Sequence, residues 1–187
     1  MKISPLVLDD VWIATSNKYD DERGFFMEWF KQETIKDVTG KDFKVAQANL
    51  SSSKRGVIRG IHYSLAPKGQ AKLVTCVSGS IRDFVIDIRV DSLTFGKWIS
   101  VDLFAGDGQA LIIGENLGHA FVALEDNAIV SYLVTSSYSP SEEFGIHPFD
   151  DTLNIQWGLP ASELVLSPKD DSAPTFLGQL AAGKLPK

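Results

Sequence analysis

The sequence predicts an all-β fold, an antiparallel sandwich or barrel that carries only a few short helices. Short runs of β-type residues recur through the middle of the chain, and turn-forming residues separate one run from the next. In one such run Ile99, Val101 and Leu103 alternate with Ser100 and Asp102, which is the two-residue period of a half-buried strand. The runs follow each other without helices between them, a pattern that argues against a parallel α/β sheet.

Several runs are predicted as strands, with residue ranges 57–63, 71–77, 81–90, 97–104, 110–113, 120–124 and 128–134. The turn residues between them lie at 67–69, 78–79, 105–108 and 125–127. Two helices are predicted nearer the ends of the chain. One spans 31–38 and ends near Gly40. The other lies in the tail, with Ser172 as its cap, Pro174 in its first turn and Gly183 near its end.

The length of 187 residues predicts one domain, 1–187, with an N-terminal arm and a C-terminal helical appendage. No apolar run approaches the ~20 residues of a membrane helix, and the first residues lack the pattern of a signal peptide. The net charge of −6 argues against nucleic-acid or membrane partners, although a few local Arg and Lys side chains suffice for a nucleotide. The single cysteine, Cys76, is expected to be buried, and these features together favour the cytoplasm.

One of the three histidines, His62, is a candidate general base. It lies near the end of a β run, next to Tyr63 and shortly after Arg59 and Gly60. Lys72 follows in the next run. Cationic neighbours lower the pKa of an imidazole, which keeps it able to accept a proton near pH 7. The spacing is a difficulty, because side chains three apart on a regular strand point to opposite faces. A bulge near Gly60 is therefore required if Arg59 and His62 are to face the same site.

A metal centre is the main alternative use of a histidine in a β-barrel. Such a centre needs clustered ligands, for example two histidines separated by one residue with a carboxylate nearby. Ser64 breaks that pattern after His62, and His119 has no other His or Cys within four residues. We therefore predict that the site holds no metal, and we expect no other cofactor.

Polar side chains near the N-terminus have more than one interpretation. The segment 20–26 is either a solvated hairpin turn or a loop in which Arg23 binds phosphate beside a ring that stacks on a base. Gln47 and Asn49 alternate along one predicted strand, so both are expected to face the same side.

The sequence pattern alone also leaves the role of polar residues in the second half of the chain undecided. Tyr132 is either a packing residue of its strand or a general acid, and Tyr138 follows it in a Ser-rich loop. The pair Lys169-Asp170 by itself has the composition of a surface turn.

Short motifs follow one another along the chain in a fixed order. They are DERGFF (21–26), QANLS (47–51), RGIHY (59–63), AKLV (71–74), DFVIDIR (83–89), SLTFGKW (92–98), GHAF (118–121) and LSPKD (166–170), with Tyr132 and Tyr138 before the last. No single motif is decisive, but the ordered set resembles the dTDP-4-dehydrorhamnose 3,5-epimerase family over nearly the whole chain. The resemblance implies a cupin-type jelly roll and a homodimer. Its substrate would be a nucleotide-linked, dTDP-type 4-keto-6-deoxyhexose, epimerised at carbon 3, carbon 5 or both.

The resemblance also implies roles for single residues. His62 would be the base, and Asp170 would fix its tautomer and stabilise the imidazolium. Lys72 would face the carbon-4 oxygen of the sugar and stabilise the enolate, and Tyr132 would be the acid on the opposite face. The substrate-binding residues implied in the same way are Arg23, Phe26, Glu28, Gln47, Asn49, Arg59, His119, Tyr138, Glu143 and Lys169.

These roles agree with the chemistry of a keto sugar. A ketone at carbon 4 acidifies the hydrogens on carbons 3 and 5, because the carbanion that forms is an enolate. A fixed cation near the enolate oxygen supplies a large stabilisation, and a base and an acid on opposite faces invert the centre.

The sequence departs from the main family at two motifs. Ser64 stands where Gln often follows the His-Tyr pair, and the segment 116–121 reads NLGHAF where GFAHGF is usual. Both changes favour the branch that makes unusual deoxysugars, in which some members act on carbon 3 or carbon 5 alone. The position of reaction and the nucleotide therefore stay open.

Two alternative functions share the predicted fold. A related 3,4-ketoisomerase typically has two histidines around one residue, and Ser64 breaks that pattern. A non-catalytic, nucleotide-sugar-binding cupin would keep the Arg and aromatic positions without needing the base and the acid. The presence of His62, Lys72, Tyr132 and Asp170 together favours the epimerase.

Overall fold

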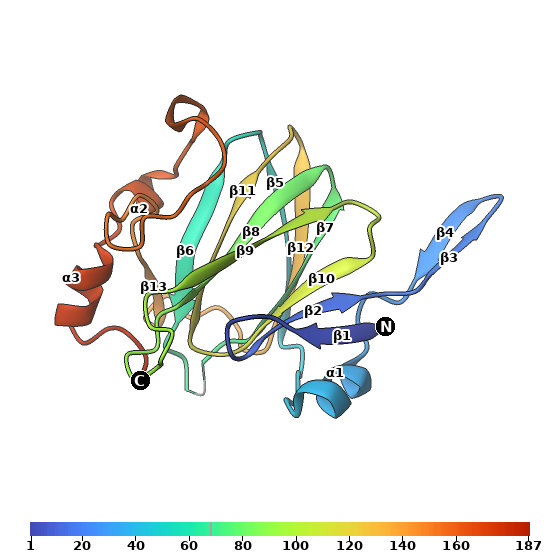
Figure 1. Ribbon diagram of the computed structural model, residues 1–187, viewed down its shortest axis with the longest axis horizontal. Coiled ribbons are helices and arrows are strands. Elements are labelled where there is room, and N and C mark those ends of the chain that lie inside the picture. The colour runs from blue at the N-terminus through green and yellow to red at the C-terminus, as the bar shows by residue number, and fades with distance from the viewer. Residues whose placement is uncertain (68) are drawn as a thin grey trace.

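The protein folds as two antiparallel β-sheets that face each other, with a separate two-stranded hairpin and a few short helices (Figure 1). This computed structural model describes residues 1–67 and 69–187. Residue 68, in the predicted turn at 67–69, lies outside the described residues. The all-β prediction is confirmed.

Each sheet is given by its strands in spatial order. The first sheet contains β1 (Lys2–Pro5), β2 (Val11–Thr15), β10 (Gln109–Ile113), β7 (Lys72–Ser78), β12 (Ala128–Val134) and β5 (Gln47–Ser53). The second sheet contains β13 (Glu143–Gly145), β6 (Ile58–Ser64), β11 (Leu117–Ala123), β8 (Ser80–Asp87) and β9 (Trp98–Phe104). The hairpin consists of β3 (Lys18–Asp21) and β4 (Gly24–Met27), and the helices are α1 (Gln32–Thr39), η1 (Ala161–Glu163), α2 (Pro168–Asp171) and α3 (Phe176–Ala181).

The main core lies between the two sheets, and the strand period decides which residues enter it. On β8, Ile81 and Val85 belong to this inner core, whereas Phe84 and Ile86 belong to a second core on the outer face. The C-terminal segment covers that outer face, where Trp157 packs edge-on against Phe84 with ring centroids 4.7 Å apart. Strands buried on both faces read as continuous apolar runs, which is why these segments were recognisable in the sequence.

The bulge required near Gly60 is present. Arg59 pairs with Phe121 and His62 with His119, so three steps along β6 match two steps along β11. Gly60 has a φ of +122°, and a Cβ added there would lie 2.5 Å from the Ala120 Cβ. A side chain therefore does not fit, and the extra residue lets Arg59 and His62 face the same cavity.

The predicted strands are all found, with small shifts at their ends. Two shifts of three residues are the largest, and one of them is at the start of β11, which begins at Leu117 instead of residue 120. The other is in β8, which ends at Asp87 instead of residue 90 because the Asp87 carboxylate accepts hydrogen bonds from Arg89, Ser92 and Thr94 and closes a turn. Helix α1 lies within one residue of its predicted range and ends at Gly40 in the left-handed conformation.

The prediction for the tail helix was wrong at its start. Ser172 ends the short helix α2 instead of capping a long one, and Pro174 lies before α3. Proline disfavours a helical conformation in the residue before it, so a continuous helix cannot cross this point. The cap of α3 is Thr175, whose Oγ1 accepts a hydrogen bond from the Gly178 backbone N–H.

The β3–β4 hairpin projects from the body of the molecule (Figure 1). Its aromatic side chains are exposed, with Tyr19 57% and Phe26 65% accessible. Cys76 is buried and free, as expected. Within residues 1–67 and 69–187, no helix is both long and apolar enough to cross a membrane.

Candidate active site

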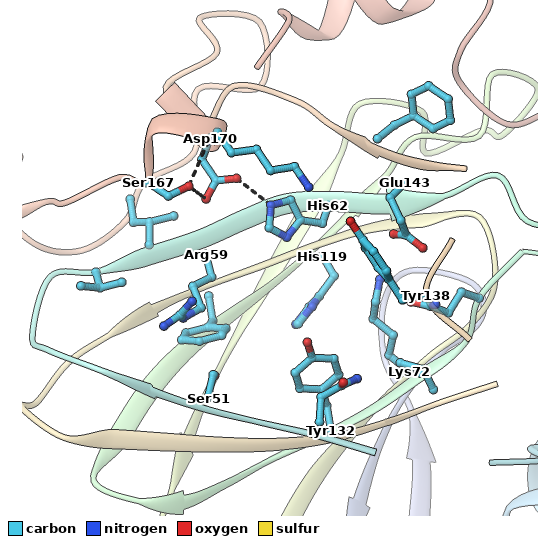
Figure 2. Close-up of a pocket in the computed structure, with 18 of the residues that line it drawn as sticks. Ser51, Arg59, His62, Lys72, His119, Tyr132, Tyr138, Glu143, Ser167 and Asp170 are labelled. Carbon is cyan, nitrogen blue, oxygen red and sulfur yellow. Dashed lines mark hydrogen bonds and ion pairs between the residues drawn. The ribbon is translucent and has the colours of Figure 1, made fainter. Parts of the chain in front are cut away.

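A pocket of about 720 Å³ opens between the two sheets, within the usual size range of small-molecule sites. All the predicted site residues line it except Arg23, Phe26 and Glu28. Figure 2 shows His62 and Tyr132 approaching this cavity from opposite sides, with His119 between them and Lys72 to one side.

The strand period explains why these residues converge. Lys72 shares the inner face of β7 with Val74 and Cys76, which both belong to the core between the sheets. Tyr132 on β12 and His119 on β11 occupy equivalent inner positions on their strands. The pocket is therefore the polar end of the space that apolar side chains fill elsewhere.

His62 forms a close pair with Asp170. Its Nε2 lies 2.6 Å from the Asp170 Oδ1, although the two residues are 108 apart in the sequence. Because a carboxylate accepts the proton on Nε2, Nδ1 is left with the free lone pair of a neutral imidazole. The His62 side chain is 38% exposed, whereas that of Asp170 is 7% exposed.

Helix α2 positions Asp170. Ser167 caps this helix, since its Oγ accepts the Asp170 backbone N–H and donates to the Asp170 Oδ2 at 2.9 Å. Burial by itself raises the pKa of the Asp170 carboxyl, but the hydrogen bonds from His62 and Ser167 outweigh it and the pKa lies below its ordinary value. The carboxylate is therefore charged at neutral pH.

A second histidine–aspartate pair lies deeper in the molecule. The Nε2 of His119 is 2.9 Å from both carboxylate oxygens of Asp83, a residue with no exposed side-chain surface. Burial raises the pKa of Asp83, and the neighbouring His119 and Lys72 oppose that effect.

Lys72 is a buried cation at the pocket wall. Burial lowers its pKa from 10.5 to about 8, while the charges of Glu143 and Asp83 act in the opposite direction. Lys72 is therefore mostly protonated at pH 7. A protonated amine in a site shielded from water can stabilise negative charge that develops on a bound ligand.

Two phenols line the same cavity. Burial raises the pKa of Tyr132, which keeps its hydroxyl protonated at neutral pH and able to donate a proton. Tyr138 is more exposed and lies at the rim, where its backbone N–H donates to the Gln47 Oε1 at 3.0 Å. Glu143 presents a buried Oε1 that has no hydrogen-bond partner among the described residues.

The predicted nucleotide-binding residues divide into two groups. Gln47 and Asn49 face the pocket from β5, as their alternation predicted, and the Gln47 Nε2 donates to the Asn49 Oδ1 at 2.6 Å. Arg59 also lines the pocket, and its Nε donates to the Ser53 Oγ at 3.0 Å.

Arg23, Phe26 and Glu28 form the other group, in or just after the hairpin. The Arg23 side chain is 85% exposed and pairs with Asp21 at 2.6 Å. These three residues therefore do not join the pocket of their own chain, and their predicted role stays a prediction.

Some pocket residues were not identified from the sequence. Ser167 was one, although the spacing Ser-x-x-Asp from 167 to 170 is a helix-capping signal. Ser51 was another, and its buried hydroxyl has no partner among the described residues. It follows Gln47 and Asn49 in the same alternation, so the strand period alone would have placed it at the site.

No group of three or more His, Cys, Asp or Glu side chains in the described part of the chain has the arrangement of a metal site. The polar groups that line the pocket include a histidine–carboxylate pair, a buried ammonium and two phenols. These are the groups of general acid–base chemistry beside a stabilised anion. Fold and site together thus define a β-sandwich acid–base enzyme.

The comparisons with known proteins identify the family. The family model for dTDP-4-dehydrorhamnose 3,5-epimerase matches residues 5–177, and the chain belongs to this family. The Mycolicibacterium smegmatis dTDP-4-dehydrorhamnose 3,5-epimerase is 42% identical over 100% of this chain and 91% of the relative. A dTDP-4-dehydrorhamnose 3-epimerase of Streptomyces niveus is 41% identical over 100% of this chain and 89% of the relative.

Solved structures give the same result. The rmlC epimerase of Mycobacterium tuberculosis matches with a TM-score of 0.96 and 41% identity, over 100% of this chain and 94% of that one. A 3′-monoepimerase of Streptomyces bikiniensis, in complex with dTDP-quinovose, matches with a TM-score of 0.92 and 40% identity. The match covers 98% of this chain and 92% of that one. The predicted cupin-type jelly roll is confirmed, and the protein is an epimerase, that is, an isomerase.

Proposed function

We propose that this enzyme epimerises a dTDP-linked 4-keto-6-deoxyhexose at carbon 3, carbon 5 or both. Relatives of both kinds are similar to it, a 3-epimerase and a 3,5-epimerase, and one similar structure was solved in complex with dTDP-4-keto-L-rhamnose. The single observation that carries the proposal is the His62–Asp170 pair, which faces a cavity that also holds Lys72 and Tyr132.

His62 acts as the base in this proposal. Asp170 accepts the Nε2 proton, so Nδ1 removes the hydrogen from the carbon next to the ketone, and the C–H electron pair moves into the enolate. The charged Asp170 then stabilises the imidazolium that forms. This carboxylate therefore has two functions, orientation before proton transfer and stabilisation after it.

Lys72 and Tyr132 complete the reaction. The Lys72 ammonium stabilises the enolate oxygen, which is where negative charge develops in the transition state. The Tyr132 phenol, on the side of the cavity opposite His62, returns a proton to the carbon from the other face. The carbon inverts, and no net oxidation or reduction occurs.

Solvent exchange tests this function and the position of reaction together. In deuterium oxide, the enzyme should introduce deuterium at carbon 3, carbon 5 or both of dTDP-4-keto-6-deoxyglucose, as read by proton NMR. The labelled carbon identifies the centre that reacts. If the sugar nucleotide binds but gains no deuterium, the protein is a binding module instead. Migration of the ketone to carbon 3 would indicate the ketoisomerase reaction.

The hairpin supports a homodimer as the functional unit. Tyr19, Phe25 and Phe26 expose their rings on an element that projects from the body of the chain (Figure 1). Exposed aromatic clusters of this kind mark protein–protein contacts. We infer that the hairpin reaches the pocket of a second copy, where Arg23, Phe26 and Glu28 meet the nucleotide.

Mixing two inactive variants tests the exchange of hairpins. His62→Asn removes the base and keeps the hairpin arginine. Arg23→Ala removes the hairpin arginine and keeps the base. A mixed dimer then contains one complete site, so random exchange of subunits should restore roughly a quarter of the wild-type sites. If Arg23→Ala alone is inactive and the mixture regains no activity although mixed dimers form, Arg23 serves its own chain. The mixed dimers can be identified by native mass spectrometry.

A cytoplasmic location also belongs to the proposal. The chain has a single cysteine, and a composition without cysteine pairs is common in proteins of reducing compartments. Microscopy of the tagged protein in its own cell would test this.

A further inference from the structure

Asp83 is a buried charge that the mechanism above does not use. It lies in the middle of β8, on the inner face between Ile81 and Val85, and its side chain has no exposed surface. A carboxylate in such surroundings is very unfavourable unless other groups compensate its charge. Its retention in a strand otherwise suited to the core therefore needs an explanation.

The compensating groups come from two other strands. His119 on β11 contacts both Asp83 oxygens through Nε2 at 2.9 Å, and Lys72 on β7 is near enough for its charge to act on the same carboxylate. His119 and Lys72 both line the pocket, whereas Asp83 does not. Asp83 therefore lies behind two pocket-facing nitrogen groups and cannot touch a ligand itself.

We propose that Asp83 is a positioning residue for both groups: it holds His119 with a proton on Nε2, and it keeps Lys72 in the ammonium form that the reaction needs. The second half rests on the proposed function, in which Lys72 stabilises the enolate. The first half depends only on the geometry of the pair.

The electrostatics of the pocket explain why Lys72 needs this help. Burial favours the neutral amine, and the charges named as opposing it are those of Glu143 and Asp83. Glu143 opposes the effect of burial most, and Asp83 adds to it from the dry interior, where little water screens a charge. The other titratable groups that line the pocket are Arg59, His62, Tyr132, Tyr138, Lys169 and Asp170.

The pH profile of Asp83→Asn tests the effect on Lys72. The ammonium is the active form, so kcat/KM falls as the pH rises through the pKa of Lys72. Loss of a nearby opposite charge lowers that pKa by about one unit or more. The alkaline limb of the Asp83→Asn profile should therefore move to lower pH by about one unit or more, with the loss of kcat greater at pH 8 than at pH 6.

Asp87→Asn is the matched control. Asp87 lies four residues along the same strand, is equally buried, and is hydrogen-bonded to Arg89, Ser92 and Thr94 away from the pocket. Its replacement should reduce stability and leave the alkaline limb where it is in the wild type. An unshifted limb in Asp83→Asn overturns the proposal, and so does an equal shift in both variants.

A measurement on the wild-type protein covers the case in which Asp83→Asn does not fold. Long-range ¹⁵N–¹H NMR of the histidine rings, assigned with His119→Gln, should show a proton on the His119 Nε2. A neutral ring protonated on Nδ1 alone would overturn the proposal. This result does not depend on turnover. Lack of deuterium exchange in the wild type would therefore count against the proposed function and leave the His119–Asp83 pair to be judged separately.

Discussion

The two histidine–aspartate pairs use the same residue types in different surroundings. His62 and His119 are register partners on adjacent strands, so their backbones lie side by side. The carboxylate of the first pair comes from helix α2, near the pocket mouth, and that of the second comes from the neighbouring strand β8 in the interior. One pair is partly open to solvent, with His62 38% exposed, whereas the His119 side chain is 11% exposed.

Burial, more than residue type, separates the roles of the two histidine–aspartate pairs. Hydrogen bonds lower the pKa of Asp170 despite its burial, whereas burial raises the pKa of Asp83. The accessible pair is suited to exchanging a proton with a substrate. The buried pair is suited to holding a fixed hydrogen-bond geometry, because little water is present to compete for its hydrogen bonds.

Removal of the accessible base should have the largest effect. We expect His62→Asn to reduce kcat by ~10²–10⁴-fold, since general base catalysis contributes that much. The variant should remain folded, because His62 lies at a pocket wall and is partly exposed. Deuterium exchange and circular dichroism measure the two effects.

His147→Asn is the control for this variant. His147 is the third histidine, and its Nδ1 accepts the Phe149 backbone N–H away from the pocket. It should retain nearly wild-type kcat. Equal losses in both variants would mean that His62 acts through structure and not through proton transfer.

Asp170→Asn should have the next largest effect, a loss of kcat of ~10²-fold, because an amide does not stabilise the imidazolium and can reverse the tautomer of His62. Asp171→Asn, next to it on the exposed side of the same helix, is the control and should be nearly neutral. The KM should change little in either variant, and steady-state kinetics will show it. A loss confined to KM would instead place Asp170 in substrate binding.

His119→Gln should change binding more than the chemical step. If His119 contacts the substrate, the variant loses that contact, and KM rises by ~10-fold while kcat changes less. Calorimetric titration with dTDP should show the same loss of affinity. A fall in kcat at unchanged KM would contradict the assignment of the chemical step to the His62–Asp170 pair and of substrate binding to His119.

The same comparison shows what sequence reasoning could reach. Alternation and turn residues identified the strands, because burial on one or both faces leaves a local pattern. The bulge at Gly60 was also foreseeable, since Arg59 and His62 could share a face only with an extra residue between them. By contrast, Lys169-Asp170 had the local composition of a surface turn, and only the family resemblance linked it to His62.

Contacts between distant segments explain the remaining gaps. The His62–Asp170 bond joins residues 108 apart, and no local pattern specifies such a contact. Asp83 was part of a recognised motif, yet its role emerged only when β11 placed His119 beside it. The roles of Arg23, Phe26 and Glu28 depend on a surface outside the single chain, and they stay predictions.

A stability measurement reports the protonation state of Lys72, which lies on the buried side of the pocket. Lys72 has a pKa of about 8 in the folded protein and 10.5 as its ordinary value. Between these values the unfolded chain binds more protons than the folded one, so the stability due to Lys72 rises with pH across this window. The gain is up to about 3 kcal/mol, since each pKa unit is worth 1.36 kcal/mol.

Urea denaturation of wild type and Lys72→Met between pH 7 and 11 tests this. The free energy of unfolding of the wild type should rise relative to that of the variant as the pH increases from about 8 to 10.5, and the difference should then level off. Lys97→Met removes an exposed lysine on the same scaffold, and its curve should stay parallel to that of the wild type. Parallel curves for Lys72→Met as well would mean that Lys72 remains fully protonated in the fold. The interior charges would then stabilise it more strongly than burial opposes it.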